Sequence, residues 1–493
     1  MTETPPLTSR RAILRASALG IAGATAPAAA SPTDAVDALV GLQVVKDRIA
    51  LAAYRQTASG TRAILGEHLR RGVFTAKRRA DYTAWLAADP HQAFCIISTV
   101  DPNVVWVRDF SGSASLDWSG AQGDGVTDDA PFINAMLQNP FVSCFRIEDG
   151  RKHLVSEPIK IRRAITLTGA GMQNSLLIAK APIDVIEVAL PSASENGLRL
   201  ADFGITNLVK AEQLTAGSGI SLNRTYLATV SNISITGGWD GLSAVASGLV
   251  NIDGLLVKGC RNAGLLFNGG HNFDLRVSRF TLSDCNYAIR LQDMCDELIF
   301  TDGVCSVSRC ALYADATSNT VNGRPEFCRF SRVSFDSCDR GLDLANCADF
   351  VFDACFVSCR PNHGAELGIR GPVENIQFIA TTFFFNGKSA AVVGPQAAET
   401  DFLACKFVSN GTTKPNAYDT LTFAAGCGTF SLSQNRFKPG WNVAGTPRYQ
   451  VRIENGGAGN YSLIGNHFSQ GGTGALLEER RGADRVLIGN IGI

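Results

Sequence analysis

The chain has 493 residues, 45% of them hydrophobic, so it can bury at least one large core. Lys plus Arg and Asp plus Glu are equal at 45 each, so no net charge attracts nucleic acid or an anionic membrane surface. No basic run with interleaved aromatic residues is present, and no segment reaches the roughly 18 consecutive apolar residues of a membrane span. Neither nucleic acid nor a membrane span is therefore expected.

The first 30 residues resemble a twin-arginine export signal. Arg10 and Arg11 precede a mildly apolar stretch, residues 16–26, and Ala28 and Ala30 form a small-residue cleavage site. The resemblance implies a signal peptide over residues 1–30 and a periplasmic or secreted protein. The alternative is the basic start of an ordinary helix.

Residues 31–71 form a predicted helical segment. A helix is expected from Thr33 to about Gln56, because apolar residues recur there at four-three-four-three spacing: Ala38, Leu42, Val45, Ile49 and Ala52. This seam could nucleate an oligomer, with a homotrimer as the form considered, or pack on the next segment of the chain. Strands between about Gly72 and Phe110 predict a small β module over residues 72–117.

A repeat of about 25 residues runs through the rest of the chain. Five cysteines stand 25, 25, 28 and 21 residues apart: Cys260, Cys285, Cys310, Cys338 and Cys359. Asn386 and Asn410 continue the series at 27 and 24. Short period-two apolar runs separated by Gly, Asn, Asp and Ser predict a solenoid over residues 118–493, with the cysteines as free thiols in one internal column. No C-x2-C pair is present, so no metal and no cofactor are expected.

A glycine- and aspartate-rich stretch, residues 120–129, precedes an apolar run. A calcium loop begun at Asp124 or Asp128 would lack its final glutamate, and no Gly-Lys-Ser/Thr follows to bind phosphate. The stretch therefore predicts a helix start with Asp128 as N-cap, Asp129 at the positive helix end and Pro131 in the first turn. Its apolar face should cover one end of the solenoid core: Phe132, Ile133, Met136 and Leu137.

The run from Trp118 to Asp129, followed by this helix, a strand over residues 164–168 and Gly169-Ala170-Gly171, resembles the start of the pectate-lyase-like superfamily. Residues 94–112 are similar to a small β module of its tailspike-like members. The resemblance implies an all-β fold: a single-stranded right-handed parallel β-helix behind an N-terminal helical segment and a small β module. The superfamily includes bacterial polysaccharide lyases, hydrolases and phage tailspikes, but the motif itself is structural.

The polygalacturonase-type branch of this superfamily carries a Gly-His-Gly element and an Arg-x-Lys element. Here Gly269, Gly270 and His271 lack the trailing glycine, and no Arg-x-Lys partner is found. A galacturonan hydrolase of that branch is therefore not indicated.

The repeat register predicts which side chains leave the strand that follows each cysteine. Adjacent rungs stack at about 4.8 Å, so the outward residues should gather on one face. They provide three candidate catalytic acids, Asp315, Asp343 and Glu366, and three candidate substrate-binding residues, Arg290, Tyr313 and Arg370. Trp239 is a further candidate, as a sugar-stacking platform or as a turn residue packed on the solenoid.

Two carboxyl groups about 5–9 Å apart are what glycoside hydrolysis needs, and mutual repulsion would keep one protonated. A lyase would instead use Arg or Tyr as base. We therefore expect an exported protein that cleaves an acidic or cell-surface polysaccharide as a hydrolase or a lyase. The alternatives are a non-catalytic tailspike-like or surface carbohydrate-binding protein, and solvated charges that only pair across rungs.

Overall fold

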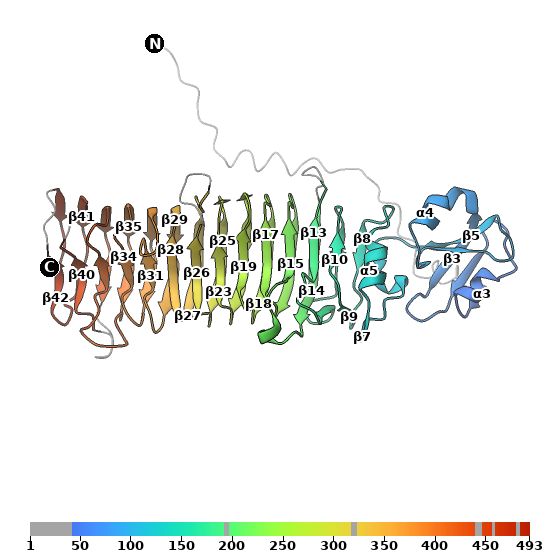
Figure 1. Cartoon of the computed structure of the whole chain (residues 1–493), viewed down its shortest axis with the longest axis horizontal. Helices are drawn as coiled ribbons and strands as arrows, with labels where there is room; N and C mark the ends of the chain where they lie inside the picture. The colour runs from blue at the N-terminus through green and yellow to red at the C-terminus, as the bar shows by residue number, and fades with distance from the viewer. Residues whose placement is uncertain (1–41, 192–196, 317–322, 439–445, 456–458, 480–483) are drawn as a thin grey trace, which may run out of the picture.

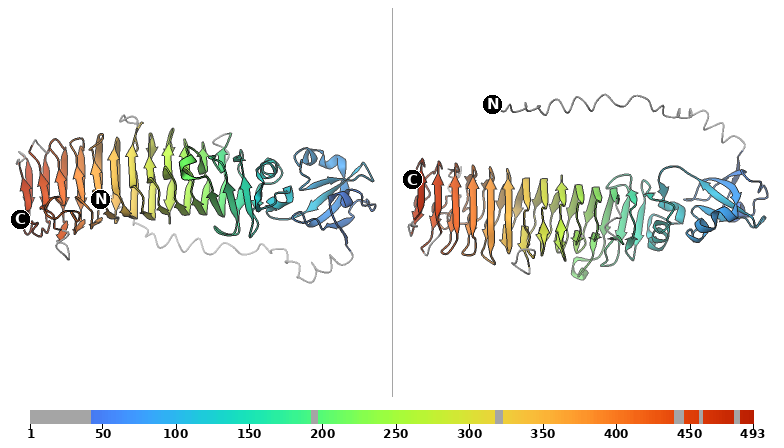
Figure 2. Two further views of the ribbon diagram at one scale, coloured as in Figure 1. Left: turned by 60° about the horizontal axis from the view of Figure 1, so that its bottom comes forward. Right: turned by 90° about the horizontal axis from the view of Figure 1, so that it is seen from above.

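The computed structural model describes residues 42–191, 197–316, 323–438, 446–455, 459–479 and 484–493. The predicted export signal lies outside these ranges. A long solenoid forms most of the molecule, and a small module adjoins its N-terminal end (Figures 1 and 2). Within the described ranges, no helix is long and apolar enough to cross a membrane.

Two parallel sheets build the solenoid. One has 13 strands, from β10 (Ile159–Ile161) to β42 (Gly474–Glu478), and the other has 23, from β6 (Ala114–Ser115) to β43 (Arg485–Ile488). One turn consists of β18 (Asn251–Lys258) in the larger sheet and β19 (Ala263–Asn268) in the smaller. The predicted single-stranded right-handed parallel β-helix is confirmed, although its sheets begin slightly before the expected residue 118.

A bend divides the long strands of the larger sheet. It falls at one residue per turn with a left-handed backbone, such as Gly254 (φ 69°) and Asp302 (φ 55°). The next turn after β18 is interrupted at this bend into β21 (Arg276–Ser278) and β22 (Thr281–Ser283). The bend therefore gives each rung a third side without an added loop.

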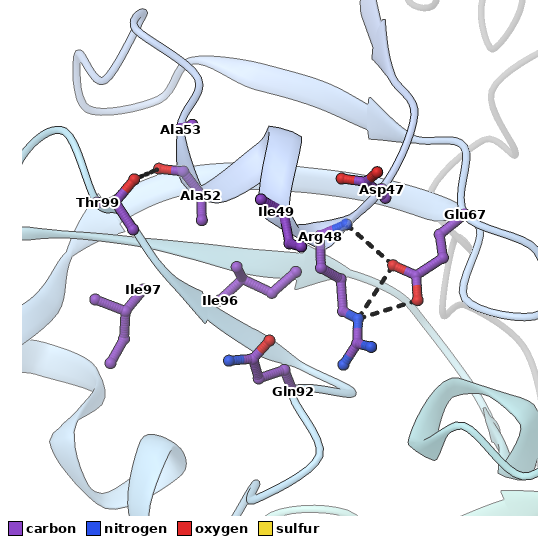
Figure 3. Close-up of a pocket in the computed structure, with 10 residues that line it drawn as sticks. All are labelled: Asp47, Arg48, Ile49, Ala52, Ala53, Glu67, Gln92, Ile96, Ile97 and Thr99. Atoms are coloured by element: carbon purple, nitrogen blue, oxygen red, sulfur yellow. Dashed lines mark hydrogen bonds and ion pairs between the residues drawn. The ribbon is translucent and has the colours of Figure 1, made fainter.

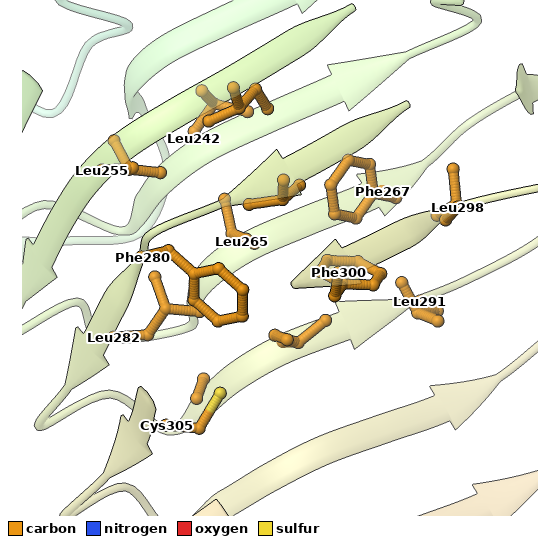
Figure 4. Close-up of a cluster of buried hydrophobic side chains, with 14 of the residues drawn as sticks. Leu242, Leu255, Leu265, Phe267, Phe280, Leu282, Leu291, Leu298, Phe300 and Cys305 are labelled. Atoms are coloured by element: carbon orange, nitrogen blue, oxygen red, sulfur yellow. The ribbon is translucent and has the colours of Figure 1, made fainter. Parts of the chain in front are cut away.

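Apolar side chains of both sheets fill the interior in columns. Figure 4 shows part of this core, with Leu255 and Leu282 from one sheet opposite Leu265 and Phe267 from the other. Phenylalanine rings stack at 4.7–4.9 Å along one column, which matches the rung spacing: Phe300, Phe330, Phe352, Phe378 and Phe402. Stacking like residues at this spacing removes each ring from water. This burial stabilises the fold by about 2 kcal/mol per side chain.

The predicted internal column exists, but one of its members is different. Cys285 N donates to Ser308 Oγ at 3.2 Å, Cys338 pairs with Cys359, and Cys359 N donates to Asn386 Oδ1 at 2.8 Å. Ser308 therefore occupies the place predicted for Cys310. Cys310 starts the next strand, β26 (Cys310–Asp315), where it pairs with Tyr287. All five predicted cysteines are buried free thiols.

The N-terminal module is a five-stranded sheet in the order β1-β2-β3-β5-β4. Its strands are β1 (Gln43–Val45), β2 (Arg62–Leu65), β3 (Gly72–Arg78), β4 (Cys95–Ile97) and β5 (Val104–Asp109). The module therefore begins well before residue 72. The predicted strands within residues 94–109 are confirmed.

Of the predicted helix from Thr33 to Gln56, only Arg48–Ala52 is helical among the described residues, and residues 33–41 lie outside the described ranges. Val45 belongs to strand β1, because this segment pairs with β2, and the helix is reduced to α3 (Arg48–Ala52). Leu51 is buried on the module core, whereas Ile49 of the predicted seam is 82% exposed. Pairing with β2 therefore replaces the continuous seam.

The helix predicted to follow the glycine- and aspartate-rich stretch is confirmed, whereas Asp124–Asp128 within the stretch forms strand β7. Helix α5 (Ala130–Leu137) buries Ile133, Met136 and Leu137 at the N-terminal end of the core. Its N-cap is Asp129 rather than Asp128, and the buried Asp129 carboxylate closes the preceding loop instead of the helix end. It accepts hydrogen bonds from Gln122 N at 2.7 Å and Gly123 N at 2.8 Å, and contacts His153 Nδ1 at 2.9 Å.

Candidate functional site

The candidate site is the outer face of the 13-stranded sheet. Strands β19, β23 (Tyr287–Leu291), β26, β28 (Arg340–Ala345) and β31 (Ala365–Leu367) stack side by side there. Their register aligns Arg290 with Tyr313, Tyr313 with Asp343, and Asp343 with Glu366. The neighbouring residues Ile289, Leu312 and Leu342 are buried in the core. The structure thus brings these predicted residues together on successive rungs.

Asp343 points out of the solenoid but is not exposed. Its side chain is only 2% accessible, because two arginines cover it. Arg370 Nε donates to Asp343 Oδ1 at 2.8 Å, and Arg340 Nη1 lies 3.0 Å from Asp343 Oδ2. Asp343 is therefore a buried, ion-paired carboxylate and not a solvated charge.

The other two acids also lie against arginines. Glu366 Oε2 accepts from Arg340 Nη2 at 2.9 Å, and Asp315 Oδ1 lies 3.3 Å from Arg370 Nη1. Each of the two arginines therefore bridges Asp343 and a second carboxylate. The three carboxylates alternate with arginines instead of forming the cluster that the sequence suggested.

A pair of tyrosines lies beside this ion-pair network. The rings of Tyr287 and Tyr313 are 4.7 Å apart, and the Arg370 guanidinium lies 4.3 Å from the Tyr313 ring. Tyr313 donates its hydroxyl to Asp315 Oδ2 at 2.9 Å. Burial and this hydrogen bond raise the pKa of Tyr313 to about 12, so it is a poor base near neutral pH.

Arg290 is the cation of this face that lacks a carboxylate partner. No ion pair within 4.0 Å involves Arg290 among the described residues, and its guanidinium lies 5.0 Å from the Tyr287 ring and 5.8 Å from the Tyr313 ring. Its Nη1 donates to Asn262 Oδ1 at 2.9 Å, and its buried Nε has no hydrogen-bond partner. An anionic group of a ligand could therefore bind here.

The predicted substrate-binding residue Trp239 is half-buried in the turn just before β17 (Asp240–Val245), one rung from Asn262. Its backbone oxygen accepts from Asn262 N at 2.8 Å. Burial raises the pKa of the neighbouring Asp240 to about 6. Trp239 is thus linked to Arg290 through Asn262, which hydrogen-bonds to both residues.

Four residues of this face were missed by sequence reasoning: Asp240, Asn262, Tyr287 and Arg340. They lie in the turn before a strand or at its first residue. The repeat register predicts orientation only for the later residues of each strand.

His363 lies on the Glu366 rung. It accepts a hydrogen bond from Ser389 N at Nδ1, 3.1 Å away, which requires a neutral ring. Burial, reinforced by the charges of Lys388 and Arg340, lowers its pKa to about 4. His363 is therefore neutral over most of the physiological range.

A pocket of about 610 Å³ lies elsewhere, in the N-terminal module (Figure 3). It is lined by α3 and by strand β4, and a bond from Arg48 Nε to Glu67 Oε1 at 3.0 Å crosses its edge. None of the predicted site residues lines it. Within the described ranges, no group of three or more His, Cys, Asp or Glu side chains could hold a metal ion.

No protein-family model matches the sequence, and comparison with curated proteins finds no match. Solved structures do match, and they are parallel β-helix proteins. The A-module of the mannuronan C-5 epimerase AlgE6 from Azotobacter vinelandii has a TM-score of 0.56 at 14% identity, over 76% of this chain and 98% of that one. The enzymatically active domain of bacteriophage CBA120 tailspike protein 2 has a TM-score of 0.53 at 14% identity, over 91% and 64%.

A third match is the gp42 tailspike of Acinetobacter phage vb_AbaP_AS12. It has a TM-score of 0.51 at 10% identity and covers 91% of this chain and 74% of the tailspike. At such identities the likeness establishes only the fold, a right-handed parallel β-helix, and does not establish the chemistry of the site.

Proposed function

We propose that this protein is exported and acts on an acidic polysaccharide bound along the outer face of the 13-stranded sheet. The observation that carries the proposal is Arg290, which lies over two tyrosine rings and has no carboxylate partner among the described residues. A guanidinium in this position can form paired hydrogen bonds with a sugar carboxylate, while the ring faces pack on the sugar. The fold shared with an epimerase module and tailspikes supports this class of ligand.

The geometry favours elimination over hydrolysis. In elimination a base removes the proton beside the sugar carboxylate, a double bond forms in the new end sugar, and the glycosidic oxygen leaves and takes up a proton to become a hydroxyl. Arg290 would neutralise the carboxylate, and Tyr287 is the base candidate because its hydroxyl has no hydrogen-bond partner within the described ranges. Hydrolysis needs a free pair of carboxyls, and here every candidate acid lies against an arginine.

The test is to incubate the mature protein with a panel of polyuronates and neutral polysaccharides. Unsaturated products are followed by ultraviolet absorbance and new chain ends by a reducing-sugar assay. We expect unsaturated products from a polyuronate, a loss of at least about 100-fold in Tyr287→Phe, and no loss in the matched control Tyr226→Phe outside this face. New reducing ends without unsaturation would indicate a hydrolase.

A non-catalytic carbohydrate-binding protein is the second candidate. The ion pairing of all three candidate acids favours it, because none of them is free to transfer a proton. It predicts that well-folded protein retains a polysaccharide in a binding assay and yields no product over long incubation.

Export is tested separately from activity. We expect the chain to leave the cytoplasm in a bacterial host with a twin-arginine pathway, and replacement of Arg10 and Arg11 by lysine to retain it there. Fractionation followed by immunoblotting measures this. Equal export of both forms would contradict the proposed route.

A further inference from the structure

A chain of three polar side chains runs from the core edge to the candidate site. Asp240 is 5% accessible at the start of β17, and its Oδ1 accepts from Asn262 Nδ2 at 2.7 Å and from Ala263 N at 3.0 Å. The same Asn262 accepts from Arg290 Nη1 at its Oδ1, 2.9 Å away. Asn262 therefore connects Asp240 to Arg290 through one hydrogen bond to each.

The chemistry of the two end groups determines how the amide lies. An ionised aspartate only accepts hydrogen bonds and an arginine only donates them. Asn262 can therefore satisfy both only with its nitrogen towards Asp240 and its oxygen towards Arg290. Without the acceptor at Asp240, the amide nitrogen loses its partner, and the side chain of Asn262 is no longer held on the side away from Arg290.

Asn262 also joins the two rungs through its backbone. Its N–H donates to Trp239 O at 2.8 Å, and its carbonyl accepts from Tyr287 N at 2.8 Å. The side chain and backbone of one residue thus contact the rung of Trp239 and the rung of Tyr287 and Arg290.

We propose that Asp240 and Asn262 are positioning residues that hold the Arg290 guanidinium over the tyrosine pair, where it meets the sugar carboxylate; the second half of this statement rests on the proposed function. Two charged groups act on Asp240 electrostatically: Arg290, which favours its ionised form, and Asp184, which disfavours it. Protonation can take place at Asp240 Oδ2, which leaves both hydrogen bonds to Oδ1 in place. The hold on Arg290 therefore depends on an acceptor at this position rather than on its charge.

The test follows the reactivity of Arg290 with phenylglyoxal, an arginine-selective reagent, by peptide mass spectrometry. Asp240→Leu and Asn262→Leu should each make Arg290 react roughly tenfold faster, as loss of one hydrogen bond to a charged group allows. Asp240→Asn keeps an acceptor and should react like the wild type. Asp184→Asn is the matched control, since Asp184 Oδ1 accepts from Ser218 N and contacts neither Asn262 nor Arg290.

Arg276 is the internal reference, because it is exposed, without an ion pair among the described residues, and on the larger sheet. A variant counts as folded when its Arg276 rate and circular dichroism match the wild type; if Asp240→Leu does not fold, Asn262→Leu and Asn262→Ala decide. An unchanged Arg290 rate in the folded leucine variants overturns the proposal.

The second measurement is the affinity for oligogalacturonate, which should fall in the leucine variants and persist in Asp240→Asn. If the wild type does not bind oligogalacturonate, the proposed function fails for this ligand, while the Arg290 reactivity still decides on the positioning role. If reactivity rises and affinity is retained, Arg290 is positioned by the pair but does not bind the sugar.

Discussion

Asp343 is a candidate catalytic residue that also holds two arginines in place. Replacing it by asparagine leaves Arg340 and Arg370 without their shared partner, at a site where Asp343 is 2% accessible. The arginines are 39% and 27% exposed, so water compensates part of the loss. We expect Asp343→Asn to lower the free energy of unfolding by about 2 kcal/mol, below the range for a fully buried pair.

The matched control is Asp315→Asn, because Asp315 is 35% exposed and should contribute less than about 1 kcal/mol. Urea unfolding measures both. An Asp343→Asn variant as stable as the wild type would mean that its ion pairs contribute nothing in solution. Loss of activity in that stable variant would then point to a direct chemical role.

Two buried groups near the site titrate in opposite senses. Burial raises the pKa of Asp240 from 3.8 to about 6, so stability that is present below pH 4 is lost as the pH rises through 6. Burial lowers the pKa of His363 from 6.5 to about 4, so stability present above pH 6.5 is lost as the pH falls through 4.

We therefore expect Asp240→Asn and His363→Gln to change the pH dependence of stability in opposite directions. Relative to the wild type, Asp240→Asn should gain on the order of 3 kcal/mol between pH 4 and pH 7, from a shift of about two pKa units. His363→Gln should lose stability over the same interval. Denaturant unfolding at both pH values measures this, and parallel curves for the three proteins would contradict it.

At the scale of elements, the burial of the cysteines predicts how many thiols react in the native protein. Of the 14 cysteines, only Cys144 at the start of β8 (Cys144–Arg146) is partly accessible, and the other 13 are buried. A thiol reagent should therefore detect at most one group in the native protein and 14 in denaturant without reductant. Fewer than 14 under denaturing conditions would reveal disulfides and contradict the free-thiol columns.

The cap of the solenoid depends on one buried carboxylate. Asp129→Ala would leave Gln122 N, Gly123 N and His153 Nδ1 without their partner in a buried site. We expect a loss of about 3 kcal/mol in unfolding free energy, measured with urea. Asp124→Ala, in the exposed part of the same loop, should cost less than about 1 kcal/mol, and equal losses would show that the loop acts as a whole.

At the scale of the whole molecule, the possible homotrimer is no longer supported by a continuous helical seam in the described residues. Residues 43–45 form a strand and only α3 remains helical, so the described part of the seam offers a partner chain little beyond Ile49. We expect Ile49→Asp to sediment at the same mass as the wild type. A fall to one third of the mass would restore the seam as a trimer interface.

The repeat in the sequence was sufficient to predict the fold. A 25-residue period with alternating apolar positions predicts a solenoid, because each rung can bury its apolar residues only against the next rung. The resemblance of residues 118–171 indicated the same fold. The N-terminal segment was not predictable in this way. Val45 has the spacing of a helix face, yet β2, some twenty residues later, offers a strand partner that local periodicity cannot reveal.

The sequence by itself determined the β-helix, the buried thiols and the row of outward side chains through Arg290, Tyr313 and Asp343, because all of these follow from local alternation and repeat length. It also determined the capping helix, because Pro131 and the apolar spacing after it are local helix signals. Only the tertiary structure decided what that row does. Ion pairs form between rungs whose spacing varies from 21 to 28 residues and whose register shifts at a bulge between Asp336 and Cys338. Which arginines cover Asp343, and which one has no ion pair among the described residues, therefore depends on side chains that meet only when the rungs stack.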